Sequence, residues 1–105
     1  MRQPKPQPLE EAARLWRAGA YWEAHEALET LWRKAAGEER CFLQGLIQLA
    51  AALEARRRGH AEGARRNLAK ARRKAGRCRR LEPQVAEVAR ALEHGTHPRW
   101  LADGA

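Results

Sequence analysis

Three side chains in the stretch YWEAHEALETLW (residues 21–32) are the chain's best candidates for metal or acid–base chemistry: His25, Glu26 and Glu29. If the stretch is helical, His25 and Glu29 lie four residues apart on one face, and an imidazole and a carboxylate so placed can bind one ion. Sites of this kind need a third or fourth ligand, and the stretch does not supply one. A divalent transition metal is therefore the only cofactor the sequence suggests, and no catalytic residue is assigned.

The same pair has a structural interpretation. Gln44 and Gln48 are the only polar side chains in the middle of the most apolar segment, and they too are four residues apart. A buried amide without a partner costs about 1–3 kcal/mol, so such a group tends to find one. We therefore expect a network in which His25 and Glu29 face Gln44 and Gln48 between two helices, with Trp32 packed beside it.

Other chemistries are disfavoured by composition. The chain contains no serine, which excludes a Ser-His-Asp hydrolase, and it has no glycine-rich phosphate loop. Cys41 and Cys78 have no ligand-like spacing, and with no signal peptide ahead of them we expect free thiols in a reducing compartment. The longest apolar run, residues 46–53, is too short to cross a bilayer. A soluble cytoplasmic protein is predicted.

The elements that must position these residues are helices. Apolar residues recur at helical spacing, no stretch alternates as a strand does, and glycines close the segments. We predict an all-α fold, a small five-helix bundle with helices at about 9–18, 21–36, 38–58, 61–75 and 83–94. The proline-rich residues 1–8 should form a disordered or extended arm ahead of a single domain, 9–105.

A weak internal repeat divides this domain. Shifting the chain by 40 residues superposes Gly19 on Gly59, Ala24 on Ala64 and Leu28 on Leu68. Each unit reads as helix, glycine turn, helix, which gives one hairpin at 9–36 and another at 38–76, followed by the C-terminal helix and tail. This arrangement is typical of tetratricopeptide-like hairpins, which present grooves to peptides or to one another.

Charge is distributed unevenly over the chain. The net charge is +8, but residues 56–80 alone hold twelve Lys or Arg and one acid. The predicted fourth helix exposes a basic patch, made of Arg65, Arg66, Lys70, Arg72, Arg73 and Lys74. Such a patch favours nucleic-acid binding through phosphates, an acidic protein partner, or a merely solvated face. No nucleic-acid motif and no aromatic residue accompanies it.

The motif and the two segments after it resemble a known family. HEALETLW fits His-x-x-x-Glu-x-x-Trp through His25, Glu29 and Trp32, and the segments FLQGLIQLAAAL and RGHAEGARRNLAKA come next. Together these resemble a bacterial and archaeal family known only as a domain of unknown function (number 309), over roughly Leu9 to Ala75. The resemblance implies an all-helical fold and a motif that matters and can bind metal. From the sequence as a whole we expect a non-catalytic interaction module or homo-oligomer, with metal binding and nucleic-acid binding as alternatives.

Overall fold

The computed structural model describes residues 8–102, and within them the chain forms five α-helices and one short 3-10 helix. The helices are α1 (Pro8–Arg17), α2 (Tyr21–Lys34), α3 (Gly37–Arg57), α4 (Ala61–Ala75) and α5 (Glu82–His94), with η1 (Arg79–Leu81) just before α5. The all-α prediction is confirmed. Except for Pro8, the predicted arm lies outside the described residues.

The turns at Gly19 and Gly59 have the same backbone geometry. Gly19 and Gly59 both take positive φ angles, 76° and 79°, which only glycine adopts without strain. In each turn the N–H after the glycine bonds a carbonyl five residues back, Ala20 to Leu15 and His60 to Ala55. This is the bond pattern of a glycine-terminated helix.

One predicted boundary is wrong. We expected the second helix to reach residue 36 with Gly37 as its cap. Instead α2 ends at Lys34, Ala35 is extended, and Gly37 is the first residue of α3 with φ 60°. The extended link carries the chain from one helix layer to the next.

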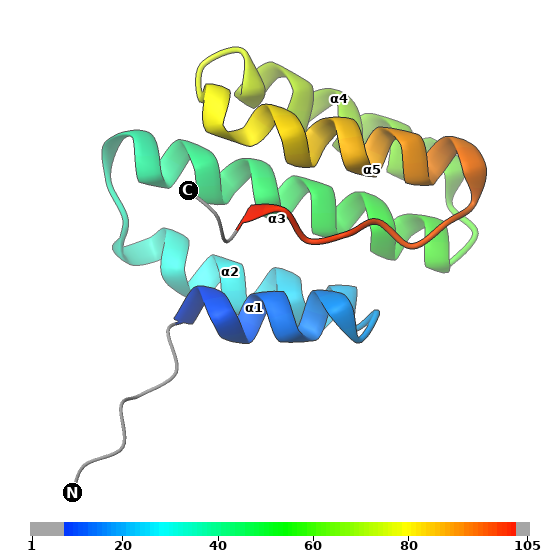
Figure 1. Ribbon diagram of the computed structural model, residues 1–105, viewed down its shortest axis with the longest axis horizontal. Coiled ribbons are helices and arrows are strands. Elements are labelled where there is room, and N and C mark those ends of the chain that lie inside the picture. Colours follow the sequence, from blue (N-terminus) through cyan, green and yellow to red (C-terminus); the bar gives the residue numbers. More distant parts are fainter. Residues whose placement is uncertain (1–7, 103–105) are drawn as a thin grey trace, which may run out of the picture.

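Helix α3 is the centre of the bundle. Figure 1 shows it between the α1–α2 pair on one side and the α4–α5 pair on the other. Its buried residues point in all directions around the axis, including Phe42, Leu46, Leu49 and Leu53, because it is covered from both sides. None of the helices in residues 8–102 is long and apolar enough to cross a bilayer.

Gly45 permits a close approach between α3 and the turn that follows α4. A Cβ built on Gly45 would overlap the side chain of Leu81, which is fully buried in η1. The absence of a side chain at Gly45 therefore lets the turn between α4 and α5 dock directly on α3. The sequence analysis did not predict η1.

Residues 96–101 form a strap that returns across the bundle after α5 (red in Figure 1). The Trp16 indole Nε1 donates a hydrogen bond to the Pro98 carbonyl at 3.0 Å, and the Tyr21 hydroxyl bonds Nδ1 of His97. Trp100 is only 7% exposed and meets Trp16 edge to face, with ring centroids 5.2 Å apart. The tail thus closes the α1–α2 side.

Gln84, fully buried in α5, fixes the other edge of the strap. Its Nε2 donates to the Arg99 carbonyl at 2.8 Å, and its Oε1 accepts from the Leu101 N–H at 2.5 Å. Glu87 accepts the Arg99 N–H at 2.9 Å, and that bond contributes most to lowering the pKa of its carboxyl below the usual value. Backbone groups of an irregular segment are therefore satisfied by side chains of a helix.

The prediction of free thiols is wrong. Cys41, near the start of α3, and Cys78, in the turn after α4, are joined by a disulfide, with their Cα atoms 6.3 Å apart. The docking of Leu81 beside Gly45 brings the turn to α3 and so brings the two sulfurs together. The cysteines therefore give no support to a reducing compartment, and a cytoplasmic location stays a prediction.

Candidate functional site

The His25–Glu29 pair is formed as predicted, at the edge of α2. Nδ1 of His25 lies 3.1 Å from Oε1 of Glu29, and the second carboxylate oxygen lies 3.5 Å from the Arg33 guanidinium. The His25 ring stacks on Trp22, with planes 9° apart and centroids 5.1 Å apart. Trp22 is about half exposed, so the pair lies where the bundle meets solvent.

The amides of α3 do not complete the expected network. Within residues 8–102, no hydrogen bond joins His25 or Glu29 to Gln44 or Gln48. Nδ1 of His25 and Oε1 of Gln48 are buried and have no partner in hydrogen-bonding geometry. Gln48 instead lines a hollow together with residues of α4, on the side of α3 away from the motif.

Trp32, the third motif residue, packs at the edge of the core and is only partly buried. The Arg40 guanidinium lies over its ring, 3.9 Å from the centroid, and its Nε1 is buried without a hydrogen-bond partner. A cation over an indole face is an attractive contact. Tyr21 and Leu28, on the same helix as the motif, are buried in the core.

The donors around the motif do not fit a metal ion. Glu26 is exposed, and no group of three or more His, Cys, Asp or Glu side chains in residues 8–102 is arranged to hold a metal. The C-terminal segment adds no donor to the motif, because His97 meets Tyr21, one helical turn before His25, and His94 is exposed at the end of α5. Two donors remain where a site needs three or four.

The basic patch on α4 is divided by the structure into two edges. Arg65 and Arg72 lie on the edge facing α5, and Arg65 also pairs with Glu62 at 2.6 Å. Lys70, Arg73 and Lys74 lie on the other edge, together with Arg77. Arg66 is exposed and lines neither. Sequence reasoning gave the residues but not this division.

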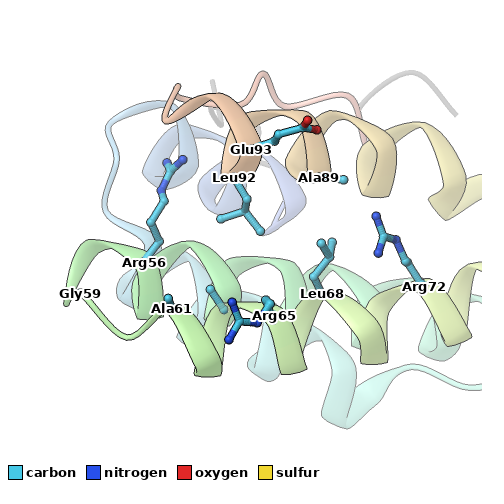
Figure 2. Close-up of a pocket in the computed structure, with 10 residues that line it drawn as sticks. Arg56, Gly59, Ala61, Arg65, Leu68, Arg72, Ala89, Leu92 and Glu93 are labelled. Atoms are coloured by element: carbon cyan, nitrogen blue, oxygen red, sulfur yellow. The ribbon is translucent and has the colours of Figure 1, made fainter.

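A groove between α4 and α5 has a volume of about 490 Å³. Its floor is apolar, and Figure 2 shows Leu68 of α4 and Leu92 of α5 pointing toward each other across it. The set that lines it, which we call the α4–α5 groove, is Arg56, Gly59, Ala61, Ala64, Arg65, Leu68, Arg72, Ala89, Leu92 and Glu93. The sequence offered a signal for it, because alanine fills most of the apolar stripe of α4.

Comparison with known proteins assigns the region that contains the motif to a protein family. The domain of unknown function DUF309 matches residues 9–67, more than half of the chain. The protein belongs to the DUF309 family. No curated protein and no solved structure matches the chain.

The DUF309 match covers the motif but not the whole structure. It runs from α1 into the first half of α4 and includes His25, Glu29 and Trp32. The strap, η1, Cys78 and the basic residues from Lys70 onward lie after its end. The function of the family is unknown, so membership does not say what this chain binds or catalyses.

Proposed function

We propose that this protein is a non-catalytic interaction module and that its α4–α5 groove binds an acidic, amphipathic helix of a partner protein. The observation that carries the proposal is the groove itself, an apolar channel bordered by arginines. The metal alternative has no comparable support, since the motif offers two donors.

The floor of the groove suits the apolar face of a helix. Ala61, Ala64 and Ala89 have small side chains, so a docked helix could come close to the backbones of α4 and α5, while Leu68 and Leu92 offer larger contact surfaces. Leu68 is 9% exposed, and Ala89 and Leu92 are partly buried, so the floor is partly uncovered in the free chain. Recognition by apolar anchors one helical turn apart is the usual mode for such channels.

The charged residues at the rim of the α4–α5 groove favour a partner helix that carries negative charge. Three arginines border the groove, Arg56, Arg65 and Arg72, against one acid, Glu93. Arg56 donates to the Ala91 carbonyl at 2.9 Å and Arg65 pairs with Glu62, but a guanidinium has five N–H donors and these bonds leave several free. Arg72 has no ion pair within residues 8–102. Carboxylates flanking the apolar face of a partner helix would meet these donors.

The test is a binding titration with a labelled peptide. The probe is a sixteen-residue helix with leucines on one face and glutamates elsewhere, followed by fluorescence anisotropy at about 50 mM salt. Arg72→Glu should weaken binding at least tenfold, or about 1.4 kcal/mol. Arg66→Glu is the matched control, on the same helix but outside the groove, and should change it less than twofold.

A second variant tests whether the apolar floor of the α4–α5 groove contacts the peptide. Ala89→Glu places a carboxylate in the groove from a partly buried position and should likewise weaken binding at least tenfold, while circular dichroism confirms that the helices remain. Equal weakening by Arg72→Glu and Arg66→Glu would contradict the proposal, because it would show attraction to net charge alone. Sedimentation of the free protein tests whether a second copy of the chain occupies the groove. A dimer that Ala89→Glu disrupts would show that it does, and would contradict the proposal of a partner helix.

A further inference from the structure

Seven basic residues between positions 66 and 79 have no acidic partner in the part of the chain that the structure describes. They are Arg66, Lys70, Arg72, Arg73, Lys74, Arg77 and Arg79, and within residues 8–102 none of them forms an ion pair. Arginines elsewhere do pair, with Glu11, Glu29, Glu39, Glu54, Glu62 and Glu87. The stretch therefore concentrates positive charge that residues 8–102 do not compensate with ion pairs.

Four of these cations converge on one place. Lys70, Arg73, Lys74 and Arg77 line a hollow of about 320 Å³ beside α3, on the edge of α4 away from the α4–α5 groove. Their spacing of three, one and three residues keeps them on one side of α4 and of the turn after it. We call this the basic hollow.

Gln48 of α3 is the fifth residue that lines the basic hollow, and its amide is not used to hold the bundle together. Its Oε1 is buried and accepts no hydrogen bond from residues 8–102. An amide can exchange its oxygen and nitrogen ends by rotation, so it can turn either a donor or an acceptor toward a ligand. The side of the hollow that α3 forms thus carries an amide oxygen that accepts no hydrogen bond within residues 8–102.

We propose that the basic hollow binds two or more adjacent phosphate groups. Neighbouring phosphates carry several negative charges in a short span, and the hollow offers four cations and no acid in an equally short span. Arginine bonds phosphate oxygens in pairs and lysine acts as a point charge, so both kinds of cation suit this ligand. No aromatic side chain lines the hollow, so bases would not be stacked there and phosphate is the recognised group.

Adjacent phosphates can come from a free oligophosphate or from a nucleic-acid backbone. The probes are therefore inorganic triphosphate and a twelve-residue oligothymidylate, each titrated into the full chain by calorimetry at about 50 mM salt. Saturable binding of triphosphate would assign a free oligophosphate, and binding of the oligonucleotide alone would assign the backbone. Either result supports the site only when substitutions in the basic hollow remove the binding.

The decisive variant is Lys70→Gln/Lys74→Gln, which removes two charges from residues that are exposed or half-buried. It should weaken binding at least tenfold, and Gln48→Leu should weaken it severalfold without any change in charge. The matched control is Arg14→Gln/Arg33→Gln, which removes two charges on α1 and α2 and should change affinity less than twofold.

Three results would overturn the proposal: no binding of either probe, equal loss in the control, or unchanged binding in Lys70→Gln/Lys74→Gln. The last would mean that these cations only complement the negative end of the α4 dipole. The basic hollow shares no residue with the α4–α5 groove, so the peptide test and the phosphate test can fail independently.

Discussion

On one side of α3, the rings of Trp16, Tyr21 and Trp100 pack together, and the strap is bonded there through its Pro98 carbonyl to the Trp16 indole. On the other side, α4 contributes mainly alanines, and the surface there is open as the α4–α5 groove and the basic hollow. We call these the closed side and the open side.

The difference separates stability from binding. Aromatic rings and satisfied backbone groups stabilise the closed side and leave little free surface to offer a ligand. Small side chains and unpaired cations stabilise less but leave apolar floor and N–H donors available. Substitutions on the closed side should therefore change unfolding, and substitutions on the open side should change binding.

The largest expected effect is that of Trp100→Ala. This variant removes the ring that packs on Trp16, and we expect it to lower the free energy of unfolding by about 3–5 kcal/mol in urea denaturation. Leu92→Ala on the open side is the comparison, with an expected loss of about 1 kcal/mol because Leu92 is only partly buried. Similar losses in both would contradict the division into two sides.

The next effect concerns two helical glycines. Gly45→Ala should cost about 1–3 kcal/mol, since its new methyl group would overlap the buried Leu81 side chain. Gly63→Ala in α4 should instead stabilise by about 0.5–1 kcal/mol, because its methyl group would meet Ala55 Cβ at an ordinary 3.5 Å. Thermal unfolding of both variants measures this, and a loss of stability in Gly63→Ala would show that the open side is packed more tightly than described.

Glu54 gives a pH-dependent effect. Hydrogen bonds from Arg57, opposed by burial and assisted by Arg58, lower the pKa of its carboxyl to about 2. Because the folded pKa is depressed, the stabilisation is present above about pH 4.5 and is lost as the pH falls toward 2. Glu54→Gln should therefore cost about 1 kcal/mol at pH 7, discounted for the exposed arginines, and little or nothing once the pH falls below about 2.

Glu62→Gln is the control for that measurement. Glu62 pairs with Arg65 on the open side, and both side chains are 70% exposed, so the substitution should leave unfolding nearly unchanged at every pH. A pH profile of Glu54→Gln parallel to that of the unmodified protein would argue against a depressed pKa.

Apart from the Glu62→Gln control, the smallest expected effect is that of His25→Ala, a loss of about 0.5 kcal/mol in the free energy of unfolding. His25 stacks on the exposed Trp22 and contacts Glu29, and it forms no hydrogen bond with Gln44 or Gln48. A loss above about 1 kcal/mol, the value expected for a buried network, would show that the α3 amides do reach it in solution. Urea denaturation of His25→Ala and of Glu29→Ala distinguishes the two cases.

Much of the fold could be predicted because its signals are local. Helical periodicity and terminal glycines placed α4 at its observed bounds and the other helices within two residues of theirs. The His25–Glu29 contact followed from a four-residue spacing on a helix. Such features depend on neighbouring residues and not on the rest of the chain.

The remaining features depend on contacts between distant residues. Trp16 and Pro98 are 82 positions apart, and Cys41 and Cys78 are 37 apart, so no local pattern joins them. The division of the basic patch into two edges could not be predicted for the same reason, since a count of charges does not show which arginines form ion pairs. Only the packing of α4 against α3 and α5 separates the rim of the groove from the basic hollow.

The most direct test of this division is to map binding on the whole molecule by NMR. The ¹⁵N-labelled protein is titrated with the acidic peptide, and amide shifts are followed together with the indole signals of Trp16 and Trp100. We expect shifts in α4 and α5 at the groove-lining positions Ala61, Ala64, Leu68, Ala89 and Leu92, with both indole signals unmoved. Shifts centred on the strap, on His25, or nowhere would contradict the claim that the open side is the binding side.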